Sequence, residues 1–222
     1  MTLTRSDFSD RIELTSANPQ YAMIWLHGLG ATCDDFVPVF ADIVRRTGLA
    51  MKALFPQAPD RPVTISGCMP MPCWYDILAA TPKRVINPDH LRASAARIHG
   101  MIRQLTEAGI ASERIFIAGF SQGGAVALET ALTFEQPLAG VICLSTYLAL
   151  PTTVHDNNRN LPVFFAHGSL DSVVPMLLGQ QSAAELKATG HPLQWHEYAM
   201  DHEVCEEEIA AIAAFVRRQL QD

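Results

Sequence analysis

A serine lies between glycines in the segment IFIAGFSQGGAVALETAL, residues 115–132. The first part of the segment is rich in residues that favour strands, and the second part is rich in alanine and leucine, which favour helices. We therefore expect a sharp strand-to-helix turn at Ser121. Glycines at 119, 123 and 124 remove side chains that would obstruct such a turn, so the Ser121 hydroxyl would be presented beyond the strand as a nucleophile.

A serine hydroxyl is a weak nucleophile at neutral pH and needs a base that is held in place by an acid. Asp171 follows the apolar segment LPVFFA, and His202 follows LQWHEYAM. The chain order Ser, Asp, His is the one that accompanies a serine at a strand-to-helix turn. We predict Ser121 as the nucleophile, His202 as the general base and Asp171 as the acid that orients the base.

Other residues could take these roles. His196 is an alternative base, but it falls inside the last strand pattern, where a side chain packs against a helix or faces solvent. Asp156 is an alternative acid in HDNNRN, which is typical of a solvated loop. His27 and His167 each precede a glycine at a strand end and do not follow the acid, so we interpret both as hydrogen-bonded structural histidines.

Acyl transfer also requires N–H donors for the oxygen that becomes negatively charged. The segment IWLHGLGA places glycines directly after an early strand, where such a loop is expected. We predict that the backbone amides of Leu29 and Gln122 form this oxyanion hole.

Short β-rich segments alternate with longer segments of helical period along the chain, which predicts an α/β fold with a mostly parallel sheet covered by helices on both faces. The predicted strands are residues 21–26, 51–55, 114–118, 140–144, 161–166 and 193–199, with a weaker one at 10–14. The predicted helices are residues 36–46, 88–108, 122–133, 175–189 and 203–219.

The segment 56–83 shows little regular pattern and is rich in proline and methionine. Long loops in compact domains are usually functional or disordered, and the aromatic content here argues against disorder. One interpretation is that this segment lines an adaptable apolar groove for an acyl chain, and the other is that it caps the core. The residues in question are Met69, Met71, Trp74, Ile77 and Leu78.

Composition sets the wider limits. With 222 residues, of which 49% are hydrophobic, the chain is expected to form one domain over residues 1–222. No segment is apolar and long enough to span a membrane, and the first residues carry charges where a signal peptide is apolar, so we expect a cytoplasmic protein. A net charge of −7 without a Lys/Arg cluster disfavours nucleic acid and anionic membranes as partners. Five cysteines without a C-x-x-C pair indicate neither a zinc site nor a disulfide framework.

The chain also resembles the phospholipase/carboxylesterase family, which includes carboxylesterases and acyl-protein thioesterases. The resemblance rests on WLHGLGA, FPQAP, RPVT, MPCWYDI, ERIFIAGFSQGGAVAL, LSTY, HGSLDSVVP and MDHEVCEEE, which occur in the order and spacing of that family. LSTY resembles the bacterial carboxylesterase branch more than the thioesterases. The resemblance implies an α/β-hydrolase fold, the same triad and oxyanion donors, a loop at 69–78 beside an acyl channel, and a possible homodimer.

Two positions depart from the family pattern. Cys73 stands where the family more often has serine before Trp74, and Asp201 replaces the usual glycine before His202. We expect Asp201 to face solvent near the N-terminus of the last helix, together with Glu203 and residues 206–208. In the alternative arrangement Asp201 lies beside the imidazole and raises the pKa of His202.

These features predict a serine carboxylesterase that hydrolyses short-to-medium-chain carboxylic esters through an acyl-enzyme intermediate. No metal or organic cofactor is expected, and the expected partner is a small-molecule or lipid ester. The alternative activity is that of an acyl-protein thioesterase or lysophospholipase. A non-catalytic binding module on a hydrolase fold is a further class, but such modules usually lose a member of the triad.

Overall fold

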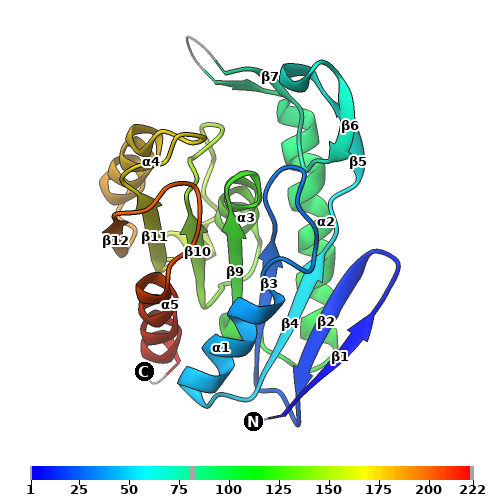
Figure 1. Cartoon of the computed structure of the whole chain (residues 1–222). Coiled ribbons are helices and arrows are strands. Elements are labelled where there is room, and N and C mark those ends of the chain that lie inside the picture. The colour runs from blue at the N-terminus through cyan, green and yellow to red at the C-terminus, as the bar shows by residue number, and fades with distance from the viewer. Residues whose placement is uncertain (1, 81–83, 221–222) are drawn as a thin grey trace.

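The computed structural model describes residues 2–80 and 84–220, which form an eight-stranded twisted sheet between two layers of helices (Figure 1). The sheet order is β1-β2-β4-β3-β9-β10-β11-β12. Neighbouring strands from β4 to β12 are parallel, whereas β2 is antiparallel to both of its neighbours, β1 and β4. The strands are β1 Leu3–Asp7, β2 Arg11–Ser16, β3 Tyr21–Leu26, β4 Met51–Pro56, β9 Ile115–Phe120, β10 Gly140–Leu144, β11 Val163–Gly168 and β12 Leu193–Tyr198.

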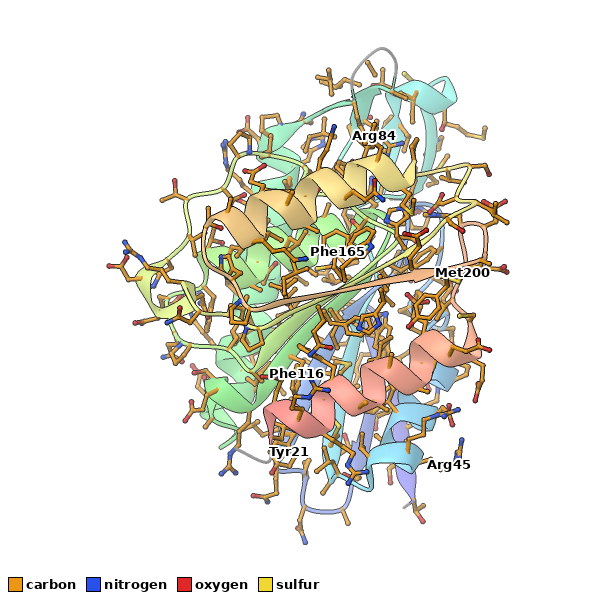
Figure 2. All side chains as sticks on the ribbon, turned by 90° about the vertical axis from the view of Figure 1, so that its left-hand side faces the viewer. Tyr21, Arg45, Arg84, Phe116, Phe165 and Met200 are labelled. Carbon is orange, nitrogen blue, oxygen red and sulfur yellow. The ribbon has the colours of Figure 1, made fainter. Side chains whose placement is uncertain are left out.

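The helices lie on both faces because the central strands are apolar on both sides. Along β3, Ala22 and Ile24 pack with one apolar cluster, while Met23 and Trp25 pack with the other. Figure 2 shows Phe165 on the side of α4 and Phe116 on the side of α5. The helices are α1 Val37–Thr47, α2 Pro88–Glu107, α3 Gln122–Thr133, α4 Met176–Ala188 and α5 Glu206–Gln219, with α1 and α5 on one face and the others on the opposite face.

This arrangement confirms the predicted α/β class with helices on both faces. The predicted strands 21–26 and 140–144 and the predicted helix 122–133 match the structure at both ends. The edge strand β1 was missed because its sequence, LTRSD, is polar and mostly exposed and so lacks the apolar alternation of a strand with a buried face. None of the described helices is both long and apolar enough to cross a bilayer.

The expectation of little regular structure over 56–83 was wrong for much of that segment. Strand β5 Asp60–Val63 pairs with β6 Met69–Pro72, and β7 Ile77–Ala79 pairs with β8 Val85–Ile86, beyond the predicted segment. These ladders are only two to four residues long, and Pro62 pairs opposite Pro70. Proline donates no hydrogen bond and is uncommon in strands, which explains why the sequence pattern failed here.

Glu208 is a buried carboxyl group in the first turn of α5, with 0% of its surface exposed. Burial raises its pKa to about 8 from the ordinary 4.5, and the nearby Cys205 amide offsets only part of that effect. Glu207, its neighbour in the same turn, is exposed.

The raised pKa predicts a pH-dependent loss of stability. Between the unfolded pKa of 4.5 and the folded pKa of about 8, the folded state keeps a proton that the unfolded state has released. The contribution of Glu208 to the free energy of unfolding should therefore fall as the pH rises through this window, by up to ~1.4 kcal/mol per pH unit. Histidines whose pKa burial lowers, such as His27 and His167, contribute in the opposite direction. In urea unfolding at pH 5 to 8, stability should become more favourable with rising pH in Glu208→Gln than in wild type, because this contribution is lost, and Glu207→Gln should keep the wild-type profile. Parallel profiles for wild type and Glu208→Gln would contradict the assignment.

Candidate active site

Ser121 lies at the turn between β9 and α3, with φ 54° and ψ −120°. Non-glycine residues rarely adopt positive φ, so this backbone is strained. The strain is held by close packing, because a Cβ atom at Gly123 would clash with the backbone oxygens of Leu26 and His27, and one at Gly119 would clash with Gly123. The predicted elbow is therefore present, and its glycines are required by the approach of α3 to β3.

His202 and Asp171 are joined by a hydrogen bond of 2.7 Å between Nδ1 and Oδ2. The Asp171 side chain is completely buried, and its other oxygen, Oδ1, accepts hydrogen bonds from the amides of Val173 at 2.9 Å and Val174 at 2.7 Å. These bonds fix the carboxylate and place the imidazole proton on Nδ1, which leaves Nε2 of His202 as a proton acceptor.

Ser121 and His202 line the same cavity, which has a volume of about 550 Å³. The ring of Phe120 packs against the imidazole with 4.6 Å between ring centroids. No hydrogen bond between Ser121 and His202 is formed within the described part of the chain. In serine hydrolases this contact often tightens only when substrate binds.

The loop that carries Leu29 is fixed on both sides. His27 Nε2 accepts the Ala58 amide at 3.0 Å, so Nδ1 carries the proton and donates to the Gly28 carbonyl at 2.7 Å. The Gly30 amide donates to the Pro72 carbonyl at 2.8 Å. Between these bonds, the Leu29 amide has no acceptor among the described residues.

The Gln122 side chain braces the other predicted oxyanion donor. Its Oε1 accepts the Trp74 amide at 2.7 Å, and its Nε2 donates to the Tyr75 carbonyl at 2.7 Å. The Gln122 backbone amide, in the first turn of α3, has no acceptor in the described chain. Cys73, the first departure from the family pattern, is buried beside this brace, where its thiol donates to Tyr75 O.

Four of the five residues considered for the acyl groove, Met69, Met71, Trp74 and Leu78, do not line this cavity. Trp74 is fully buried and donates from Nε1 to His27 O at 2.9 Å, so it supports the loop before Leu29. Met69 and Leu78 are 60% and 44% exposed outside the cavity, and Met71 packs over Gly30. Of the segment's apolar residues named above, Ile77 does line it. The apolar wall is made by Leu29, Phe36, Val39, Ile65, Ile77, Phe120, Val173, Val174 and Val204.

Apart from Ile77, this wall was missed because it is assembled from parts of the chain that lie far apart in the sequence. The two valines of HGSLDSVVP were the one available signal, since they lie two and three residues after Asp171, the predicted acid.

The histidines and the aspartate that were considered as alternatives take other positions in the structure. His167 is buried, with Nε2 2.8 Å from Val174 O and 3.4 Å from Asp171, and burial lowers its pKa. This confirms its interpretation, and that of His27, as structural histidines. His196, in β12, stacks on Phe164 of the neighbouring strand β11. Asp156 is exposed before β11, where it forms an ion pair with Arg159. Neither residue is brought to Ser121.

Asp201 is exposed, as expected, but its carboxylate does not share the N-terminus of the last helix. That helix begins only at Glu206, with Cys205 as its N-cap. The Asp201 carboxylate instead accepts hydrogen bonds from Ser172, the residue after Asp171. Within residues 2–80 and 84–220, no group of three or more His, Cys, Asp or Glu side chains has a geometry that could hold a metal ion.

Comparisons with known proteins agree with this geometry. A model of the family described as phospholipase/carboxylesterase matches residues 9–220. Acyl-protein thioesterase 1 of Neurospora crassa is 36% identical over 211 residues, covering 89% of this chain and 86% of the relative. Acyl-protein thioesterase 1 of Gibberella zeae is 35% identical over 211 residues, covering 89% and 90%. The crystal structure of SOBER1 from Arabidopsis thaliana is 27% identical and superposes with a TM-score of 0.85, covering 90% of this chain and 99% of that chain.

These matches confirm the family resemblance. Both thioesterases come from fungi, so they do not support the bacterial carboxylesterase branch that LSTY suggested. The family match extends over nearly the whole chain, and the sheet order and elbow are those of an α/β-hydrolase. The chain therefore belongs to the phospholipase/carboxylesterase family and is a serine hydrolase of the thioesterase and esterase type.

Proposed function

We propose that Ser121, His202 and Asp171 carry out acyl transfer in two steps. The observation that carries this proposal is the buried Asp171 bonded to a His202 that faces the same cavity as the elbow serine. Ser121 Oγ attacks the acyl carbonyl while His202 Nε2 takes its proton and then gives it to the departing sulfur or oxygen. Water repeats the sequence on the acyl-enzyme and regenerates Ser121.

The amides of Leu29 and Gln122 act in this proposal as donors to the oxyanion in both steps. Three observations support this role: both residues line the cavity with Ser121, neither amide has an acceptor within the described residues, and hydrogen bonds hold the Gln122 side chain and the residues next to Leu29. Fixed donors stabilise the developing charge without reorganising, and each is typically worth about 3 kcal/mol of barrier.

The proposed substrate is a long-chain acyl thioester on a lipidated protein, rather than a small carboxylic ester. Two observations favour this alternative: relatives at 35% and 36% identity are named acyl-protein thioesterases, and the cavity of about 550 Å³ beside Ser121 has a mostly apolar wall. An apolar wall stabilises an acyl chain in proportion to the surface it removes from water. Oxygen esters react by the same steps.

One observation favours a lysophospholipid as a second substrate class. Arg84 lines the cavity, where its guanidinium donates to Val173 O at 3.2 Å and lies 5.0 Å from the centre of the Tyr147 ring. Most of its five N–H groups have no acceptor among the described residues, so they are available to a phosphate.

Replacement of the nucleophile gives the first test of this function. Ser121→Ala should lower turnover by about 10⁶-fold and abolish labelling by a fluorophosphonate probe, because the attacking oxygen is lost. Peptide mass spectrometry of the wild type should place the adduct on Ser121. Ser6→Ala, in the exposed edge strand β1, should keep both activity and labelling. Native turnover in Ser121→Ala would reject the proposed nucleophile.

Chain-length selectivity tests the thioester proposal. For a series of S-acyl peptides, kcat/KM should rise about fourfold for each methylene buried, until the cavity is filled. Ile65→Asp places a charge in the cavity wall at an exposed position and should lower kcat/KM for octanoyl substrates about tenfold more than for acetyl substrates.

Met69→Asp is the matched control, because Met69 is also exposed but lies outside the cavity. A flat chain-length series, or the same loss of selectivity in both variants, would contradict the proposed acyl site.

Arg84→Gln tests the second substrate class. Loss of a charge-assisted hydrogen bond should lower kcat/KM for a lysophosphatidic acid about tenfold and leave a monoacylglycerol of the same chain length almost unchanged. Equal effects on both lipids would show that Arg84 does not bind phosphate.

A further inference from the structure

We infer that Asp201 is a positioning residue that fastens the loop carrying the base to the loop carrying the acid. The inference rests on the proposed roles of Asp171 and His202 and adds a residue that the family pattern does not supply, since glycine is usual at this position. It concerns the loop after β11, residues 169–175, and the loop after β12, residues 199–205.

The two loops run side by side beyond the sheet. The Ser169 amide donates to Tyr198 O at 2.8 Å, and the Leu170 amide donates to Met200 O at 3.1 Å. Figure 2 shows Met200 beyond the end of β12, in the loop that continues to α5. At Gly168 the loops are so close that a Cβ atom would clash with the oxygens of Met200 and Asp201. Backbone pairing therefore joins the loops as far as Met200.

Asp201 continues this pairing with its side chain. Its Oδ1 accepts the Ser172 amide at 2.9 Å and the Ser172 hydroxyl at 3.0 Å. The same oxygen accepts the His202 amide at 2.8 Å. One oxygen thus connects the residue that follows the acid to the backbone of the base itself.

This bridge runs beside the catalytic pair and acts on its geometry. Asp171 and His202 are joined through their side chains at 2.7 Å, while Ser172 and His202 are joined through Asp201. The loop after β11 is thus tied to the loop after β12 at two adjacent residues, Asp171 and Ser172. Two such links restrict both sliding and rotation of one loop against the other. The imidazole is consequently held where Nε2 faces the cavity, without Asp201 touching substrate.

The chemistry of Asp201 suits this role. The Ser172 amide and hydroxyl lower the pKa of the Asp201 carboxyl, so it is ionised and a strong acceptor at neutral pH. With glycine at 201, the Ser172 and His202 amides would lose their shared acceptor. Because both lie at the exposed rim, water would replace it and the loops would lose a link rather than unfold.

Three variants test the inference with a neutral acyl thioester. Asp201→Gly should lower kcat about tenfold with little change in KM, because a small displacement of the base affects proton transfer more than binding. Asp201→Asn keeps the acceptor oxygen without the charge and should stay within about threefold of wild-type kcat. Asp156→Gly, an exposed aspartate before β11, is the matched control and should not change kcat.

Circular dichroism melting accompanies each variant. If Asp201→Gly is unfolded at the assay temperature, Ser172→Ala replaces it, since it removes the hydroxyl donor at the other end of the bridge and should lower kcat about threefold. Unchanged kcat in a folded Asp201→Gly or in its replacement would overturn the inference. Equal losses in the Gly and Asn variants, or a rise in KM alone, would also overturn it. Activity remaining in Ser121→Ala would instead reject the proposed function.

Discussion

The site depends on how closely the first turn of α3 approaches β3. A Cβ atom at Gly123 would clash with the backbone oxygens of Leu26 and His27, so any side chain there would push the helix away from β3. That contact holds Ser121 at φ 54°, and the Ser121 carbonyl accepts the Thr146 hydroxyl at 2.6 Å. The strain is maintained because neighbouring backbone leaves no room to relax. The same approach brings the Gln122 amide toward the loop after β3, so one packing contact organises both the nucleophile and the proposed oxyanion donors.

The sheet order supplies the rest. Strands β3, β9, β11 and β12 all end at the same edge, so the loops that follow them carry Leu29, Ser121, Asp171 and His202 to one place. Functional groups gather at this edge in open parallel sheets. The loops after β11 and β12 are bonded to each other, and the loop after β3 is bonded to the segment around Trp74. For Leu29, Asp171 and His202, precise placement therefore comes from contacts between loops, since the strands only bring these loops together.

The sequence was informative where local chemistry decides the structure. The G-x-S-x-G turn, the position of Asp171 and His202 after strands, and the apolar central strands were all readable because each reflects one segment. The cavity wall was not, because Ile65 and Val173 become neighbours of Ser121 only through the fold. Trp74 illustrates the limit: an aromatic residue in a Met-rich loop suggested substrate contact, yet its indole N–H is used to hold His27 O. Asp201 could not be oriented from sequence because its partner lies 29 residues earlier.

The central claim is that Ser121, the Leu29 and Gln122 amides and the Asp171–His202 pair act on one acyl carbon. A crystal structure of the enzyme inactivated by a long-chain alkyl phosphonate tests this most directly, because the adduct resembles the tetrahedral intermediate. We predict that phosphorus is bonded to Ser121 Oγ and that the phosphonyl oxygen lies within hydrogen-bonding distance of both amides. The alkyl chain should run along Phe36, Ile65 or Val173. An adduct on another residue, or a phosphonyl oxygen directed away from both amides, would contradict the account.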